Sequence, residues 1–434
     1  MSGEPMLKRI AISQVELGMF LHKLEGSWFK HPFWKSRFLL DDPSMLEELQ
    51  HSALDTVVID TEKGLDLRAI PRRVTPDERP KSPPPPVFRT ARRAPVPIRR
   101  DMPAPVDLRS TAPQPMAREF GLAKKVAGES RKVVSRMFLQ ARLGKTIKAA
   151  QVEPVIEDIF ASVQRNPHAF NGLMRCKRDN EFVYRHVLAV SALMISLARQ
   201  MKLPPAQIRE AGMAGLLLDV GIGHLPVDLS AYGGDYRNVP IKVFEQHVDL
   251  GHRLLSAAGG LPPRVLEACA AHHEALDGTG YPNKLKGDEI GLFPRMAAIC
   301  DTYDAMVSDT AEGVGMNPSS AIEQLSYMKA WFDADVLKHF IDMIGIYPIG
   351  SVVRLRSERL AMVVDQDPAD YSRPRLRTFW SIPQGKLVRS EYIELGECYG
   401  EDEIVASVEP EDYGIADFAA LRERLFALAG KAAA

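Results

Sequence analysis

The most informative stretch of the chain is His272-His273-Glu274-Ala275-Leu276-Asp277-Gly278-Thr279-Gly280-Tyr281-Pro282. Two adjacent imidazoles lead into a glycine-punctuated turn, an arrangement that no structural role requires. Imidazole is a common protein ligand of borderline divalent metals. The stretch therefore predicts a functional site rather than a structural turn.

Two further polar residues lie on expected apolar helices. Between residues 181 and 201 the apolar positions repeat with helical spacing, and His186 lies beside that stripe, which predicts an inward side chain. A lone inward His is more often a core residue than a ligand. Asp219 ends the apolar helix predicted over 208–218, where a buried carboxylate is costly unless it is paired or bound to a cation. A helix cap or a salt bridge is the alternative for Asp219.

The chain resembles the HD-GYP family of metal-dependent phosphohydrolases, whose substrates are cyclic dinucleotides, chiefly cyclic di-GMP. The resemblance covers about residues 180–347. It rests on the HHExxDGxGYP run, on the segment Leu285-Lys286-Gly287-Asp288-Glu289-Ile290, and on Arg295 ahead of Asp301-Thr302-Tyr303-Asp304-Ala305. A match of that length and order is more specific than a short motif.

The resemblance implies two metal positions that share Asp219. The implied ligands are His186, Asp219, His247, His272, His273 and Asp301. One position is complete, with Asp219 and the three later His residues. The other lacks the His of the family's HD doublet, because Leu218 stands there. Three imidazoles with a carboxylate suit iron or manganese better than calcium or magnesium. We expect one bound ion, and at most two.

Three further departures fall on the substrate side of the site. The family has a phosphate-contacting Lys where this chain has Ile222, and nucleotide-contacting cations where it has Thr310 and Gly313. Each lost charge-assisted contact removes about 1.5–3 kcal/mol. The leading hypothesis is therefore a catalytically degenerate protein of cyclic di-GMP signalling that acts by nucleotide sensing or partner contact. The alternatives are an active cyclic di-GMP phosphodiesterase, in which Asp219 bridges two metals, and a structural module whose His cluster is a polar core network.

Some implied ligand and partner contacts remain in the sequence. Lys284, Lys286 and Arg295 flank the turn and are candidate phosphate contacts, with solvated surface charge as the equal alternative. In some family members the turn contacts GGDEF-type cyclase partners. The residues that would do so here are Gly278, Gly280, Tyr281 and Pro282.

Composition limits the partners and the compartment. Lys and Arg (55) nearly balance Asp and Glu (56) among 434 residues, so no global field favours DNA or RNA. The four scattered Cys residues form no CxxC pair, and no apolar run is long enough to span a membrane. We therefore expect a cytoplasmic protein.

The fold class that we predict is mainly α, and four regions are expected. A small α+β accessory domain occupies residues 1–75, and a Pro- and Arg-rich tether occupies 76–117. An HD-type helical bundle follows at 118–347, and a β-rich appendage with a terminal helix closes the chain at 348–434. Whether the first helices of the bundle form a homodimer is left open.

Overall fold

The structure, a computed structural model, divides the chain into two units, residues 1–107 and 108–434. It describes residues 7–25, 38–40, 46, 56–61, 63–65, 108–142, 146–175, 182–227, 232, 235–309, 314–367, 370–398, 400–415 and 418–429.

The first unit holds a four-stranded antiparallel sheet in the order β1-β4-β2-β3. Its elements are β1 (Leu7–Ala11), the 3-10 turn η1 (Ile12–Gln14), β2 (Phe20–Glu25), β3 (Phe38–Leu39) and β4 (Thr56–Asp60). Val57 and Ile59 alternate with less buried neighbours along β4, as expected for a strand with one face on a core. Ile10, Met19 and Leu21 pack with them. The helical part of the expected α+β domain, near residues 43–50, lies almost wholly outside the described residues.

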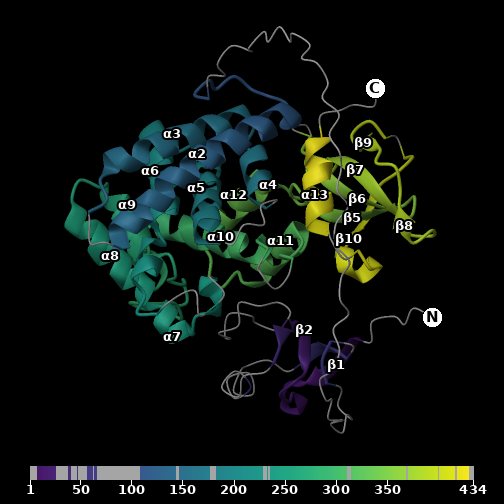
Figure 1. Cartoon of the computed structure of the whole chain (residues 1–434), viewed down its shortest axis with the longest axis horizontal. Coiled ribbons are helices and arrows are strands. Elements are labelled where there is room, and N and C mark those ends of the chain that lie inside the picture. The colour runs from purple at the N-terminus through teal and green to yellow at the C-terminus, as the bar shows by residue number, and fades with distance from the viewer. Residues whose placement is uncertain are drawn as a thin grey trace, which may run out of the picture. The chain divides into compact units, whose positions relative to one another are not determined.

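The second unit begins with a bundle of helices (Figure 1). The α-helices are α2 (Met116–Arg142), α3 (Ala149–Arg165), α4 (Ala169–Met174), α5 (Phe182–Gln200), α6 (Pro205–Leu217), α7 (Ile241–Phe244), α8 (Gln246–Ala258), α9 (Pro263–Ala271), α10 (Leu292–Val307), α11 (Pro318–Tyr327) and α12 (Ala334–Ile344). Three 3-10 helices join them: η3 (Val220–His224), η5 (Tyr236–Asn238) and η6 (Gly287–Glu289).

Helix α5 is the centre of this bundle. It packs against α2, α3, α4, α6, α10 and α12, and its residues from Val187 to Ala198 are all buried. Among the described residues α5 is the one helix long and apolar enough to cross a membrane, with a mean hydropathy of 1.3, yet 89% of that window is buried in the protein. Its composition is thus accounted for by its place in the core.

Two glycines let neighbouring backbones come close enough to build the site. A Cβ on Gly215 would lie 2.8 Å from the Cα of Ser191, so α6 can approach α5 only without a side chain there. A Cβ on Gly221 would lie 1.9 Å from the carbonyl oxygen of His247. Because Gly221 has none, η3 rests directly on α8, and Asp219 at the start of η3 comes beside His247.

A β-rich region follows the bundle. Its strands are β5 (Val352–Leu355), β6 (Arg359–Asp365), β7 (Arg375–Ser381), β8 (Lys386–Leu387), β9 (Tyr392–Glu394) and β10 (Ile404–Ser407). They form one antiparallel sheet in the order β10-β5-β6-β7-β8, and β9 also pairs with β7. After η7 (Pro410–Tyr413), helix α13 (Phe418–Ala427) lies between the sheet and the bundle (Figure 1). The mainly α class with β-containing ends is therefore confirmed.

The structure differs from the expected tether over residues 108–117. These residues pack on α3, where the Arg165 guanidinium donates to the carbonyl oxygens of Leu108 and Ser110. Arg165 also pairs with Glu119 of α2 at 2.6 Å, and both side chains are almost fully buried. Arg165 therefore holds this segment in place by donating hydrogen bonds to it, although the composition of the segment would not let it fold alone. The rest of the expected tether lies outside the described residues.

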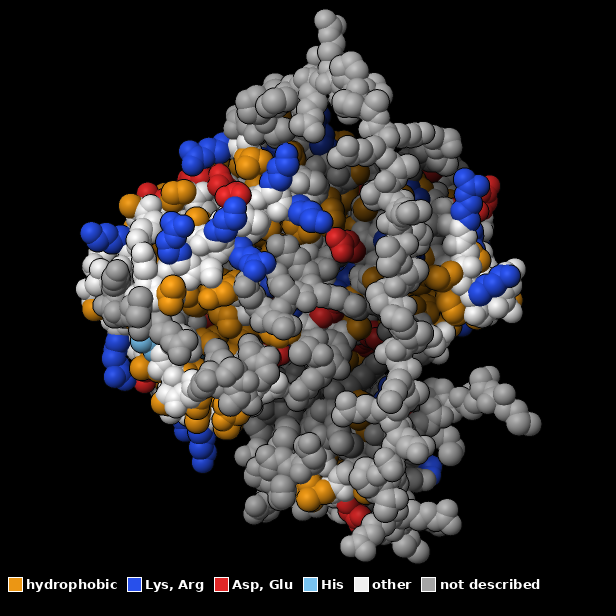
Figure 2. Space-filling view, viewed as in Figure 1, with side chains coloured by type: hydrophobic (Ala, Val, Ile, Leu, Met, Phe, Trp, Pro, Cys, Tyr) orange, Lys and Arg blue, Asp and Glu red, His pale blue; other side chains and the backbone are white. Residues whose placement is uncertain are grey.

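The exposed surface of α2 is basic. Lys124, Lys125, Lys132 and Arg136 are exposed on it, and Figure 2 shows Lys and Arg side chains gathered on this face of the protein. Two of these cations pair with acids, Lys124 with Glu423 at 3.4 Å and Lys132 with Glu129 at 2.9 Å. Such exposed pairs contribute little to stability. The surface is a local departure from the overall charge balance.

Candidate metal centre

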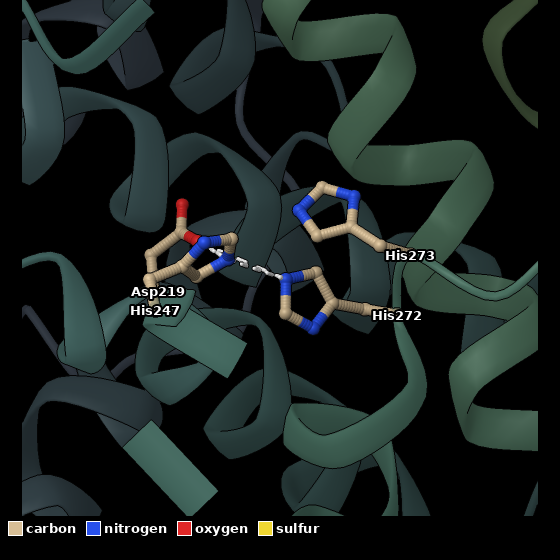
Figure 3. Close-up of side chains that lie close together, drawn as sticks. All are labelled: Asp219, His247, His272 and His273. Carbon is tan, nitrogen blue, oxygen red and sulfur yellow. Dashed lines mark hydrogen bonds and ion pairs between the residues drawn. The ribbon is translucent and has the colours of Figure 1, made fainter. Parts of the chain in front are cut away.

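The carboxylate of Asp219 joins two groups of ligands. Its Oδ1 lies 3.3 Å from His247 Nε2 and 3.8 Å from His272 Nε2, while its Oδ2 lies 3.3 Å from His186 Nε2. Figure 3 shows Asp219, His247, His272 and His273 converging on one point. Because each oxygen faces a different set of imidazoles, Asp219 is placed to bridge two cations.

Backbone carbonyls fix the orientation of two of these rings. His247 Nδ1 lies 2.6 Å from the carbonyl oxygen of Phe244, and His272 Nδ1 lies 3.2 Å from that of Cys269. A carbonyl only accepts, so each Nδ1 donates and each Nε2 carries the lone pair. Both rings therefore present their metal-binding nitrogen to the space beside Asp219.

The spacing of these atoms fits a bound divalent ion. His247 Nε2 and His272 Nε2 are 3.3 Å apart, and two lone pairs at that distance repel unless a cation lies between them. Ligands about 2.0–2.1 Å from a tetrahedral ion lie about 3.3–3.4 Å from one another. The ligand atoms of Asp219 and the three His residues all lie within 4.8 Å of one another.

The second group consists of His186, Asp219 and Asp301. His186 Nε2 lies 2.8 Å from Asp301 Oδ1, and its Nδ1 lies 2.8 Å from Asp304 Oδ2. Asp304 was not predicted as a site residue, although it follows Asp301 by three residues on α10 and so shares its helix face. It orients His186 as the carbonyls orient the other rings.

Electrostatics favour a cation at this point. Burial raises the pKa of Asp219, but hydrogen bonds with His186, His247 and His272 bring it well below its usual value, so the carboxylate is ionised. Burial lowers the pKa of His273, and a proton on this ring would also be repelled by the adjacent His272 and His247, so the ring is neutral. An ionised carboxylate beside a neutral imidazole is the protonation state that metal binding requires. His186 differs: burial lowers its pKa, but Tyr236 and hydrogen bonds with Asp219, Asp301 and Asp304 raise the pKa well above its ordinary value, so a metal must displace a proton there.

Comparison with known proteins identifies the family. Residues 159–336 match the HD domain, and residues 7–152 match a domain of unknown function, DUF3391. Over 401 residues the chain is 37% identical to the cyclic di-GMP phosphodiesterase PA4108 of Pseudomonas aeruginosa, with 92% of each protein covered. The chain belongs to the HD-GYP family.

More distant relatives align with parts of the chain. The cyclic di-GMP phosphodiesterase PdeB of Borreliella burgdorferi is 24% identical over 204 residues, which are 47% of this chain and 53% of that protein. The 3'3'-cGAMP-specific phosphodiesterase 2 of Vibrio cholerae is 32% identical over 122 residues, which are 28% of this chain and 23% of that protein. Among the relatives of this HD-GYP chain, cyclic dinucleotides are thus the common substrate class.

Two of the HD-GYP positions that this chain has lost are described by the structure. Leu218 follows the last residue of α6 and is 0% exposed, and Ile222 in η3 is 2% exposed. Both are core residues that cannot donate to a metal or a phosphate. Thr310 and Gly313 lie outside the described residues.

The Gly-Tyr-Pro turn packs against the metal ligands. The Tyr281 ring stacks on His273, with ring centroids 4.6 Å apart. Glu274 accepts from the backbone N–H groups of Asn283 and Leu285, at 2.7 and 3.0 Å, which closes the turn. Gly280 is buried, Gly278 has a φ of +78°, and Pro282 is partly buried. Tyr281 and Gly280 thus pack directly against His273, and the use of the motif as a partner contact stays a prediction.

Arg295, predicted as a phosphate contact, has structural partners in the folded turn, and the phosphate contact stays a prediction. Its guanidinium donates to the carbonyl oxygens of Ile290 and Gly287, at 2.7 and 2.9 Å, and pairs with Asp333 at 2.7 Å. The carbonyl oxygens of the turn at η6 can accept a further hydrogen bond, and the Arg295 guanidinium donates to those of Gly287 and Ile290. Lys284 and Lys286 are exposed, and their role as phosphate contacts stays a prediction.

We expect Arg295→Ala to lower the free energy of unfolding by about 1–3 kcal/mol, since two carbonyl groups and Asp333 lose a charged donor. Urea denaturation of the full chain measures this. Lys284→Ala, at an exposed position of the same loop, is the control and should change it by less than about 0.5 kcal/mol. Unchanged stability together with weakened nucleotide binding would restore the original assignment of Arg295.

Proposed function

We propose that this HD-GYP protein binds cyclic di-GMP, or a related cyclic dinucleotide, at a metal centre with two unequal positions. One divalent ion, iron or manganese, binds tightly at Asp219, His247, His272 and His273. A second ion binds weakly at His186, Asp219 and Asp301. Hydrolysis is largely lost, and the protein acts in cyclic di-GMP signalling by nucleotide sensing or partner contact.

The single observation that carries this proposal is the unequal distribution of donors around Asp219. Its Oδ1 lies beside His247 and His272 of the group with three imidazoles, whereas its Oδ2 lies beside His186. His273 stands between the two groups, with its Nδ1 3.9 Å from Asp301 Oδ2. Imidazole nitrogens bind borderline divalent ions more strongly than carboxylates do. The buried isobutyl group of Leu218 supplies no donor to the poorer position.

A loss of hydrolysis follows from the same inequality. Two ions together supply an activated water and stabilise the leaving oxygen in phosphodiester cleavage. A weakly held second ion removes part of that chemistry, and Ile222 removes a phosphate contact as well. The remaining residues would still bind one ion. Asp219 would be a ligand of that ion together with His247, and Asp304 orients the His186 ring.

A second candidate function is an active cyclic di-GMP phosphodiesterase. Two features of the geometry favour it. Asp219 has one oxygen beside each group of potential ligands. The second group offers three ligands, His186, Asp219 and Asp301, and a catalytic metal usually has three protein ligands and an open position. The full-length similarity to PA4108, which is named as such an enzyme, also supports it.

The test combines metal analysis with nucleotide assays on the full chain. Purified protein loaded with manganese or ferrous iron should contain close to one tightly bound ion, bind cyclic di-GMP, and release neither pGpG nor GMP. 3'3'-cGAMP is assayed in parallel. Multiple turnover that His186→Ala abolishes would establish the second candidate instead, because His186 belongs only to the weak position.

The proposed partners are a GGDEF-type protein at the Gly-Tyr-Pro turn and a second copy of the chain, and the proposed compartment is the cytoplasm. Balanced charge supports the absence of DNA or RNA as partners. Co-purification with a GGDEF protein and light scattering of the chain alone test the two protein contacts. Tyr281→Ala should weaken the first contact if the turn makes it.

A further inference from the structure

We propose that Arg422 of the C-terminal helix α13 is a positioning residue for the metal ligand His186. Arg422 lies outside residues 159–336, which match the HD domain, and it is 1% exposed. This role depends on the metal binding proposed above. It means that the β-rich C-terminal appendage helps to set the position of a metal ligand.

Arg422 is paired with a residue just beyond the metal-ligand helix α10. Its Nη2 lies 2.5 Å from Asp309 Oδ2 and also donates to the carbonyl oxygen of Arg175. Asp309 is itself buried, at 6% exposure. A buried ion pair of this kind is costly to break from one side, because the remaining charge loses its partner without gaining water.

The chain neighbour of Asp309 connects this pair to His186 through two hydrogen bonds. Ser308, the neighbour of Asp309, donates its hydroxyl to Asp304 Oδ2 at 3.1 Å. The same carboxylate oxygen lies 2.8 Å from His186 Nδ1. A displacement of Asp309 therefore moves Ser308 and loosens the carboxylate that sets the ring orientation of His186.

The backbone of Asp309 adds a second connection. Its carbonyl oxygen accepts from Arg185, the residue before His186 on α5, at 2.7 Å, and from Arg237 at 3.4 Å. Arg237 follows Tyr236, whose ring lies 5.9 Å from that of His186. One residue of α5 and one of η5, both beside His186, thus donate to Asp309, the acid that Arg422 pairs with.

The tight metal position is held by other means. His247 and His272 are oriented by the carbonyl oxygens of Phe244 and Cys269, whereas His186 is oriented by the Asp304 carboxylate. Loss of Arg422 should therefore act on one position only. That selectivity distinguishes a positioning role from a general effect on folding.

The test is a manganese titration of the full-length protein followed by electron paramagnetic resonance, which counts free ions and detects coupled pairs. The wild-type chain should show a tight site and a weak site. Arg422→Met should weaken the weak site by more than about threefold, which is less than the roughly 10- to 100-fold cost of losing a direct partner of a metal ligand, and it should change the tight site by less than about twofold. Arg422→Lys, which keeps the charge, should recover part of the loss.

Two further variants keep the outcome decisive. Ser308→Ala removes the hydrogen bond to Asp304 without leaving a buried charge, so it answers the question if Arg422→Met does not fold. Glu423→Gln, at an exposed position of the same helix, is the matched control and should leave both sites unchanged. A weak site unchanged by Ser308→Ala, equal weakening of both sites, or a wild-type chain with one class of site overturns the positioning role. A wild-type chain that binds no manganese overturns the proposed metal binding itself.

Discussion

Asp219→Ala should remove both metal ions at once. Asp219 is the one described residue whose oxygens face both groups of ligands, so its loss leaves three imidazoles on one side and His186 with Asp301 on the other. Because losing an outer partner already costs about 10- to 100-fold in metal affinity, losing this shared ligand should cost more than about 100-fold at each position. Elemental analysis after dialysis against metal-free buffer measures the effect.

Two controls frame the Asp219 experiment. Asp219→Asn keeps the shape of the side chain but removes its charge and one metal-binding oxygen, and it should behave like Asp219→Ala. Asp249→Asn changes an exposed acid on the same helix as His247 and should leave metal content intact. Retention of one full ion by Asp219→Asn would show that the imidazoles alone hold it, and the bridging role would then be wrong.

Leu218→His should raise metal occupancy from about one ion toward two. The substitution adds an imidazole at the position where HD-GYP proteins carry the His of the HD doublet, next to Asp219. An added imidazole that binds the ion directly should raise the metal affinity of the weak position by at least about 10- to 100-fold. Without metal the same variant should be less stable by about 1–3 kcal/mol, because it buries a polar ring in place of an apolar side chain.

Leu218→Phe is the matched control for that variant, since it adds a ring without a nitrogen donor. It should leave metal occupancy unchanged. We expect little rescued hydrolysis in Leu218→His while Ile222, Thr310 and Gly313 remain, and a product assay with cyclic di-GMP measures this. Efficient turnover on gaining the His alone would mean that the missing phosphate contacts matter little.

The six residues that the sequence predicts as ligands lie together in the structure, and the family resemblance supplied their order. Helical spacing alone could only indicate that His186 points inward, and it left a core role open. The spacing of Asp301 and Asp304 on one helix could have indicated that Asp304 also faces His186, yet that residue was missed. Its importance depends on an interhelix contact that no local pattern contains.

The partners of Arg295 could not be predicted from the sequence. A cation beside a predicted site is a reasonable phosphate contact, but which acceptors surround it is set by the folded turn at η6 and by Asp333, 38 residues away in the chain. The same limit applies to residues 108–117, whose composition indicates a tether although Arg165 binds part of them. Arg295 and Arg165 each bind partners that are distant in the sequence, and composition does not indicate such partners.

The backbone contact at Gly221 has a consequence for ion choice. Since η3 and α8 meet without a side chain between them, the backbones that carry Asp219 and His247 are held close together. An ion such as calcium, with bonds of about 2.3–2.6 Å and a need for six to eight oxygens, requires a wider ligand set. We therefore expect this main-chain contact to favour smaller divalent ions, whichever side chains stand at positions 218 and 222.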